Sequence, residues 1–284
     1  MTATSSAPAL SEAIYRDGIV TLKGALPPQW ADGVLADFDL LYREAEQRDL
    51  LTPDGSARGR VPRGPGHDAR RYYLAVHPER VSGFRDLVTH PLVDAVCREV
   101  LGDDYQYVEV GFDVALPGAV RQPLHRDFPT PDETLATGRL SSLAINATCV
   151  DVTPDMGPLE IAPGSQFDDS AEMEYGGMRV PKALYDRYDR IEQRMARRGD
   201  VSVRTGLTIH RGTANTSSRP RPVMIVGVMG AQYQTFADHE LSMTTQYFGT
   251  LPPDLQRHLQ RATVVDEMVP IVQDYALDFL LEEG

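Results

Sequence analysis

A histidine and an aspartate two residues apart are the first candidates for chemistry in this sequence. They are His125 and Asp127, within the stretch Pro-Leu-His-Arg-Asp-Phe. If this stretch is extended, both side chains project from one face and Arg126 points away. An imidazole and a carboxylate then converge on one point, as ligands of a metal ion do. Because such triplets also occur by chance on protein surfaces, the pair needs a third ligand.

His210 supplies that third ligand. It ends an apolar run, residues 206–209, that follows the turn at Gly199 and Asp200. Taken alone, it fits equally well as a strand-end histidine satisfied by hydrogen bonds. Two histidines and one carboxylate on a β scaffold, however, form the facial triad of non-haem iron(II) oxygenases, which leaves metal positions open for co-substrate and dioxygen. The three residues together predict an iron site.

Two arginines follow His210 at the start of the next apolar run. They are Arg219 and Arg221, directly before the run 223–228. If the chain turns and returns antiparallel, an arginine at this place lies beside the histidine. A fixed guanidinium there can hold a carboxylate through two parallel hydrogen bonds. The alternative is a surface arginine with no partner in the site.

The elements that must position these residues are predicted to be short β-strands. Beyond Asp104, apolar runs of strand length are separated by turns, at residues 105–116, 141–152, 158–164, 200–210 and 221–234. This spacing favours a sandwich or barrel core over about 104–235. We expect the polar, Arg/Glu-rich segment 169–198 to be a helical insert, and 255–281 to form one or two C-terminal helices.

The first part of the chain, about 11–102, is predicted to be mainly helical. Residues 11–26 combine a helix-like beginning with a short apolar strand at 19–22, and 30–46 have the periodicity of an amphipathic helix. A further helix is predicted from Val81 to Leu101, ending at Gly102. We expect these helices to pack outside the β core, with residues 1–284 forming one domain.

A glycine-, proline- and arginine-rich stretch, residues 51–71, interrupts this helical part. Its arginines are Arg58, Arg60, Arg63, Arg70 and Arg71. A loop of this length inside a domain is usually either functional or disordered. The sequence leaves two interpretations open, a lid that closes over the barrel mouth and a solvated surface loop.

The order of these motifs resembles the phytanoyl-CoA dioxygenase (PhyH-like) family. The resemblance rests on the His-x-Asp motif, the segment 151–165 (DVTPDMGPLEIAPGS), the Gly-Asp turn, and His210 followed by Asn215, Ser217 and Arg221. The segment 15–26, YRDGIVTLKGAL, also looks like the opening of that family. The resemblance therefore covers nearly the whole chain.

This resemblance implies a fold and an activity. The fold is mainly β, a double-stranded β-helix (jelly-roll, cupin-like) core with flanking helices. His125, Asp127 and His210 match the iron(II) ligands, and Arg221, rather than Arg219, matches the arginine that binds the distal carboxylate of 2-oxoglutarate. The implied enzyme uses iron(II), 2-oxoglutarate and O2, with ascorbate as a stimulant, to oxidise a C–H bond of a small organic molecule. Members act in many natural-product pathways.

Hydroxylation is the default outcome of this chemistry, whereas desaturation, ring closure and epimerisation also fit the ligand set. Halogenation is disfavoured because the related halogenases lack the carboxylate ligand that Asp127 provides. The family's PGSH motif ends here in Gln166, and a serine often found two places after the second histidine is replaced by Gly212. That leaves Thr213 or another hydroxyl to complete the co-substrate site. Other candidate contacts for substrate or co-substrate are Gln122, Asn146 and Thr148.

Composition narrows the class of partner. A formal charge of −13 argues against binding to nucleic acid or anionic membranes. No stretch approaches the roughly 20 apolar residues of a membrane span, and the first residues lack the features of a signal peptide. The two cysteines, Cys97 and Cys149, lie in apolar runs, which suits buried thiols in a reducing compartment. We therefore expect a cytoplasmic enzyme with a small-molecule substrate; its oligomeric state is not indicated.

Two other functions use the same residues. A cupin-like protein binds a ligand or structural metal without turnover, and a zinc hydrolase uses a similar triad. Neither needs a clamp for a carboxylate, so Arg221 favours the oxygenase. The charge of the substrate stays open, because the acidic composition suits a cation and the arginine-rich stretch suits an anion.

Overall fold

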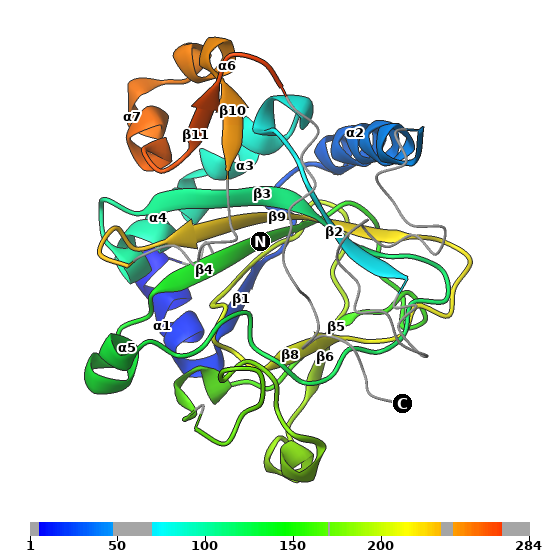
Figure 1. The fold of residues 1–284 in the computed structure, drawn as a ribbon, viewed down its shortest axis with the longest axis vertical. Helices are drawn as coiled ribbons and strands as arrows, with labels where there is room; N and C mark the ends of the chain where they lie inside the picture. The colour runs from blue at the N-terminus through cyan, green and yellow to red at the C-terminus, as the bar shows by residue number, and fades with distance from the viewer. Residues whose placement is uncertain (1–5, 48–69, 170, 234–240, 269–284) are drawn as a thin grey trace.

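Two antiparallel β-sheets form the jelly-roll core of the protein (Figure 1). The structure is a computed structural model, and it describes residues 6–47, 70–169, 171–233 and 241–268. The larger sheet has the strand order β1-β7-β4-β9-β3-β2 and the smaller has β6-β5-β8. The larger sheet comprises β1 (Ile19–Leu22), β2 (Arg71–Ala75), β3 (Gln106–Ala115), β4 (Ser142–Thr148), β7 (Val201–Arg204) and β9 (Arg221–Met229). The smaller comprises β5 (Leu159–Ile161), β6 (Glu192–Arg194) and β8 (His210–Gly212). The predicted jelly-roll fold is confirmed.

Four helices from the first part of the chain cover the outer face of the larger sheet. They are α1 (Ala7–Asp17), α2 (Pro28–Gln47), α3 (Phe84–Val88) and α4 (Pro91–Leu101). Alternate strand residues such as Met224, Val226 and Val228 pack with helical residues such as Ile14 and Phe38 in one buried cluster. Because strand side chains alternate between faces, the other half of each strand is left free to line the interior of the barrel.

The remaining short elements lie around this core. They are η1 (Pro78–Arg80), α5 (Asp132–Thr137), η2 (Ser165–Phe167), η3 (Lys182–Arg187), β10 (Ser242–Thr244), α6 (Thr245–Thr250), α7 (Pro253–Gln256), η4 (Arg257–Leu259) and β11 (Thr263–Val265). Strands β10 and β11 form a separate parallel pair. Figure 1 shows this pair with α6 and α7 at one end of the molecule.

The prediction of a single helix from Val81 to Leu101 is wrong. The structure divides it into α3 and α4, which begins at Pro91. Proline lacks an N–H group and restricts the residue before it, so a helix does not continue through it. The side chain of His90 instead accepts a hydrogen bond from the Leu92 backbone N–H at 3.3 Å and caps the second helix. The apolar periodicity continued across the break and hid it.

The two other predicted helical regions also differ from the structure. In the insert 169–198, the described residues form the 3₁₀ helix η3 and the strand β6, which pairs with β5, and no α-helix. Within 255–268, the end of α7 is followed by a 3₁₀ turn and the strand β11, while 269–281 lie outside the described residues. Both segments have polar, helix-compatible compositions, and pairing with neighbouring strands decided their conformation.

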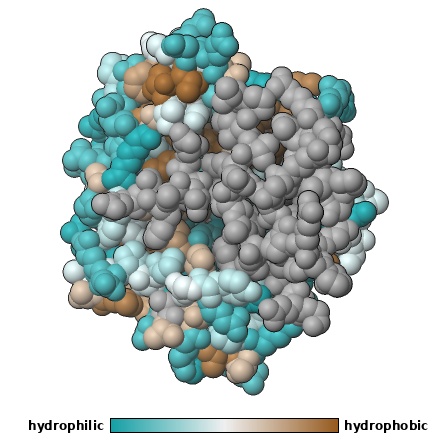
Figure 2. Space-filling view, viewed as in Figure 1, coloured by the Kyte–Doolittle hydropathy of each residue, from teal (hydrophilic) through white to brown (hydrophobic). Residues whose placement is uncertain are grey.

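The described part of the face shown in Figure 2 carries mainly hydrophilic residues, and its apolar residues form separate patches, one of them near the end where α6, α7, β10 and β11 lie. At that end of the fold, Val264 on β11 is 43% exposed. No helix in the described part of the chain has both the length and the apolar character of a membrane span.

A close contact between α2 and the start of α3 fixes how the helices sit on the sheet. The Trp30 indole N–H donates to the Gly83 carbonyl at 3.1 Å. A Cβ atom at Gly83 would lie 2.4 Å from a methyl group of Val34 and 2.5 Å from the Trp30 ring. Only glycine leaves room for both side chains at this crossing.

Gly83→Ala is therefore expected to destabilise the protein by about 1–3 kcal/mol, the usual cost of overpacking a buried contact. Gly33→Ala, on α2 itself, is the control, because its Cβ would meet only the Ser82 hydroxyl at 3.7 Å. Alanine in a helix interior is better than glycine by roughly 0.5–1 kcal/mol, so this variant should be stabilised. Urea denaturation measures both, and equal stability of the two variants would contradict the packing account.

Candidate metal centre and co-substrate pocket

Reciprocal backbone hydrogen bonds join the His-x-Asp segment to β8. The His125 N–H donates to the His210 carbonyl at 3.0 Å, and the His210 N–H donates to the His125 carbonyl at 2.8 Å. This isolated antiparallel bridge places the two imidazoles side by side, with ring centroids 4.3 Å apart. The segment is not a strand of its own, yet its pairing gives the same convergence that an extended stretch was predicted to give.

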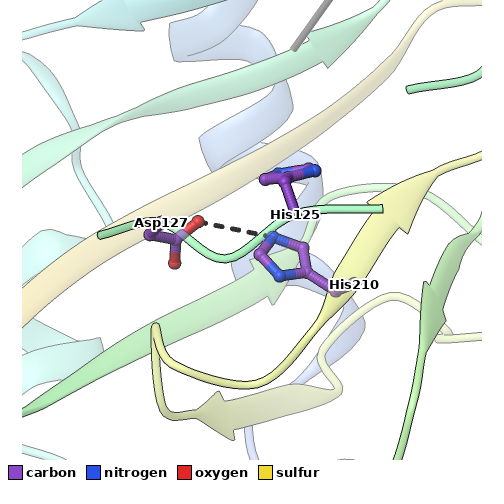
Figure 3. Close-up of side chains that lie close together, drawn as sticks. All are labelled: His125, Asp127 and His210. Carbon is purple, nitrogen blue, oxygen red and sulfur yellow. Dashed lines mark ion pairs between the residues drawn. The ribbon is translucent and has the colours of Figure 1, made fainter. Parts of the chain in front are cut away.

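Asp127 completes the cluster from the same segment. Its backbone N–H donates to the Gly206 carbonyl at 2.9 Å, and its Oδ1 lies 3.3 Å from Nε2 of His210. One ligand atom from each of the three side chains lies within 4.8 Å of the others, and Figure 3 shows the side chains directed toward one another. Two imidazole nitrogens and a carboxylate oxygen at this spacing suit a divalent transition metal.

Each imidazole is held in one tautomer by the backbone. Nδ1 of His125 lies 2.9 Å from the Pro123 carbonyl, and Nδ1 of His210 lies 2.9 Å from the Thr208 carbonyl. A carbonyl oxygen only accepts, so both Nδ1 atoms carry the proton and both Nε2 atoms keep a lone pair. Burial, together with the neighbouring His210, holds the pKa of His125 well below its usual range and favours the neutral form that ligates metals.

Arg204, at the end of β7, contacts the cluster and was not anticipated from the sequence. Its Nη1 donates to Oδ2 of Asp127 at 2.8 Å. Burial of Asp127 opposes ionisation, but Arg204 and His210 outweigh that effect and hold the pKa of Asp127 well below its usual range. The carboxylate is therefore ionised and ready to bind a cation.

Arg126 anchors the segment from the opposite side. It points away from the ligands, as expected, but it is fully buried rather than solvated. Its Nη1 donates to the Thr130 hydroxyl and, at 3.2 Å, to the Asp168 carbonyl. These bonds tie the segment to the chain beyond η2 and limit its movement.

The cluster opens into a cavity of about 570 Å³ between the two sheets. Alternate residues of β4, β9 and β7 form its floor: Ser142, Ala144, Asn146, Thr148, Val223, Ile225, Gly227, Ser202 and Arg204. The register of the sheet places Arg204 beside Ala144, and Ala144 beside Gly227. Small side chains therefore separate the metal-ligand cluster from the far wall.

Arg221 lines the same cavity, whereas its rival does not. Arg221 is 5% exposed, and its Nη2 donates to Asp113 at 3.1 Å. Arg219 is exposed and contacts the Met156 sulfur at 3.7 Å. Strand β9 begins at Arg221, so this side chain faces inward with Val223 and Ile225. Of these two arginines, Arg221 is therefore the one that can contact a molecule in the cavity.

A second arginine, Arg71, lies beside Arg221 and was missed as a cavity residue. The sequence assigned it to the arginine-rich stretch, but it begins β2 and is 8% exposed. Its Nη1 lies 4.0 Å from Asp113, and burial and Arg221 lower its pKa to about 10. Among the described residues, Nε and Nη1 of Arg71 and Nε of Arg221 have no hydrogen-bond partner. Two buried cations share one carboxylate, so this end of the cavity suits an additional anion.

Gly212 and Thr213 do not have the arrangement expected from the sequence. The Thr213 hydroxyl donates to the Pro158 carbonyl at 2.9 Å, and its side chain does not line the described cavity. Arg71 occupies the place instead, with its Nη2 donating to the Thr213 carbonyl at 2.6 Å. A Cβ at position 212 would lie 2.4 Å from the Arg71 Nη1. Glycine at this position thus makes room for a guanidinium.

The other polar candidates do line the cavity. Asn146 and Thr148 lie on its floor, and Gln122 lies at its wall. The Gln122 side-chain oxygen accepts from the Gly212 N–H at 2.8 Å, which fixes the carboxamide next to β8. The loop prediction for residues 51–71 falls, up to residue 69, outside the described residues.

The sequence profile of the phytanoyl-CoA dioxygenase (PhyH) family matches residues 14–223. The chain belongs to this family. It is accordingly a 2-oxoglutarate-dependent non-haem iron dioxygenase that uses iron(II), 2-oxoglutarate and O2. The donor set at His125, Asp127 and His210 and the buried arginine pair both suit these groups.

Several known proteins are similar to this family member. The dioxygenase trt7 of Aspergillus terreus (strain NIH 2624 / FGSC A1156) is 23% identical over 270 residues, covering 93% of this chain and 81% of the relative. The epimerase SnoN, solved with Fe3+, alpha ketoglutarate and nogalamycin RO, aligns with a TM-score of 0.61 and 18% identity over 95% of each chain. EctD from S. alaskensis, solved with 2-oxoglutarate and 5-hydroxyectoine, has a TM-score of 0.61 and 16% identity, covering 83% of this chain and 81% of that one.

The placement of the arginines gives a testable difference within this dioxygenase. Arg221→Ala removes a cavity guanidinium and should raise the KM for 2-oxoglutarate at least about tenfold, as expected when a charge-assisted bidentate contact is lost. Arg219→Ala, two residues away and exposed, is the matched control and should leave KM unchanged. Succinate formation at varied 2-oxoglutarate measures both. A larger effect from Arg219→Ala would contradict the assignment.

Proposed function

We propose that His125, Asp127 and His210 hold the iron ion of this dioxygenase. The observation that carries the proposal is the convergence of their ligand atoms within 4.8 Å on a buried, hydrogen-bonded frame. When bound, the metal supplies oxidation of a C–H bond with O2 and 2-oxoglutarate. The chain's own residues orient the ligands and exclude water.

We propose that Arg221 and Arg71 bind the distal carboxylate of 2-oxoglutarate together. The unpaired guanidinium atoms at this end of the cavity support this role, because a carboxylate accepts several hydrogen bonds from paired donors. The Asp113 carboxylate contacts both guanidinium groups and keeps them in place. Gln122, Asn146 and Thr148 are proposed as further contacts to the co-substrate or substrate from the wall and floor.

The proposed substrate is a small organic molecule that lies in the cavity over the floor residue Ala144. On the next strand, the Glu109 side chain lies over Gly227, where an added Cβ would come within 2.9 Å of it. Hydroxylation is the proposed reaction. A role in natural-product biosynthesis is supported by structural neighbours named for nogalamycin biosynthesis, the carbocyclase SnoK and the epimerase SnoN.

The chain is proposed to act as one domain in the cytoplasm. Strands β1 and β2, from the N-terminal part, pair with β7 and β3 of the core and so extend the same sheet. Cys97 and Cys149 are both free and buried, which suits a reducing compartment.

The experiment that tests the proposed metal site replaces each histidine in turn. His125→Ala and His210→Ala should each abolish succinate formation from 2-oxoglutarate in the presence of iron(II), ascorbate and candidate substrates, because each removes one ligand. His258→Ala is the control, because this histidine is also buried but stacks on Tyr105 and does not line the cavity. Normal turnover by either triad variant, with the protein folded by circular dichroism, would refute the assignment.

A further inference from the structure

The Arg204 side chain occupies a position that its strand alone does not require. It ends β7, is 5% exposed and extends along the cavity floor to the metal-ligand cluster. Its Nη1 lies 2.8 Å from Oδ2 of Asp127 and 3.5 Å from Nδ1 of His210. Because that Nδ1 already carries the proton donated to Thr208, the second approach is a contact and the bond to Asp127 is the specific one.

This bond makes the two oxygens of Asp127 different. Oδ2 accepts from the guanidinium, whereas Oδ1 faces Nε2 of His210 at 3.3 Å, on the side where the ligand atoms converge. A carboxylate held in this way offers one oxygen to a metal. A freely rotating carboxylate can instead bind with both oxygens and occupy a further coordination position.

The bond also changes the charge of the centre. Metal-bound imidazoles are neutral, so the Asp127 carboxylate is the anionic ligand among the three, and Arg204 balances its charge. A divalent metal here therefore keeps most of its positive charge. In a water-poor cavity this charge attracts an anion more strongly than it does in bulk water. The charge therefore strengthens the binding of a dianionic 2-oxo acid, but it does not strengthen the binding of the metal itself.

We propose that Arg204 is a positioning residue that holds Asp127 as a one-oxygen ligand and keeps the centre positive, so that the metal accepts the 2-oxo acid. The proposal rests on the proposed metal and co-substrate roles. Arg204 then affects the two affinities in opposite directions. Its guanidinium repels the metal ion and so weakens metal binding, but it strengthens binding of the anionic co-substrate. An arginine that only stabilised the fold would influence both in the same direction.

The test measures the two affinities separately by titration calorimetry. Mn(II) is titrated into metal-free protein, and 2-oxoglutarate into the Mn(II)-loaded protein without O2. Arg204→Met should raise the Kd for 2-oxoglutarate about tenfold or more, because a buried positive charge that attracts the anion is lost, while the Kd for Mn(II) stays equal or falls. Arg204→Lys, which keeps the charge, should recover most of the 2-oxoglutarate affinity.

Two further variants guard this comparison. Arg194→Met removes another cavity-lining guanidinium, one that pairs with Glu192 at 2.9 Å, and should leave both affinities near those of the parent protein. Arg204→Gln keeps a donor for Oδ2 without the charge; it replaces Arg204→Met if thermal melting shows the latter unfolded, and should also weaken 2-oxoglutarate binding.

Several results would overturn the proposal. They are an unchanged Kd for 2-oxoglutarate in Arg204→Met, a parallel loss of Mn(II) and 2-oxoglutarate binding, and an equal effect in Arg194→Met. A parent protein that binds Mn(II) but no 2-oxoglutarate would contradict the proposed co-substrate site itself, so the two failures are distinguishable.

Discussion

The backbone bridge between His125 and His210 is the interaction on which the metal centre depends. The bridge joins the segment that contains His125 to the short strand β8 through hydrogen bonds of 2.8 and 3.0 Å. The segment and the strand are far apart in the sequence. Buried backbone groups require such partners, so the pairing that satisfies the backbone also sets the spacing of the imidazoles. Arg126, buried behind the segment, limits its movement on the other side.

Side chains alternate along the strands of the larger sheet, so one face of the sheet stabilises the fold and the other carries the residues of the candidate site. One face packs Met224, Val226 and their neighbours against the helices, and this apolar contact stabilises the sheet. The other face carries a charge pattern that apolar packing would not tolerate: Arg221 at one end of the cavity and the Arg204–Asp127 pair at the other. Each buried charge has a partner or faces the cavity, so the rigid face supports the reactive one.

Much of this arrangement could be predicted from the sequence, because it depends on local spacing. The His-x-Asp motif, the position of His210 and the apolar strand runs are local signals. The prediction for β3 is close to its observed limits, whereas the run 200–210, predicted as one element, forms β7 and β8 in different sheets. Arg71 could not be placed in the same way, since its position follows from the long-range pairing of β2 with β3. The one available signal was that Arg71 and Tyr73 are two residues apart, so in a strand both side chains face the same side of the sheet. The hydrogen bond from the Thr213 hydroxyl to the Pro158 carbonyl could not be predicted either, because it joins residues far apart in the sequence.

The most direct measurement of the central claim is anomalous diffraction from crystals grown with Mn(II) and 2-oxoglutarate. Data collected above and below the manganese absorption edge locate the metal without reference to activity. We expect one strong peak within bonding distance of Nε2 of His125, Nε2 of His210 and Oδ1 of Asp127, with the co-substrate extending from it toward Arg221 and Arg71. A peak bound by other side chains, or a co-substrate whose distal carboxylate lies away from both arginines, would contradict the central claim.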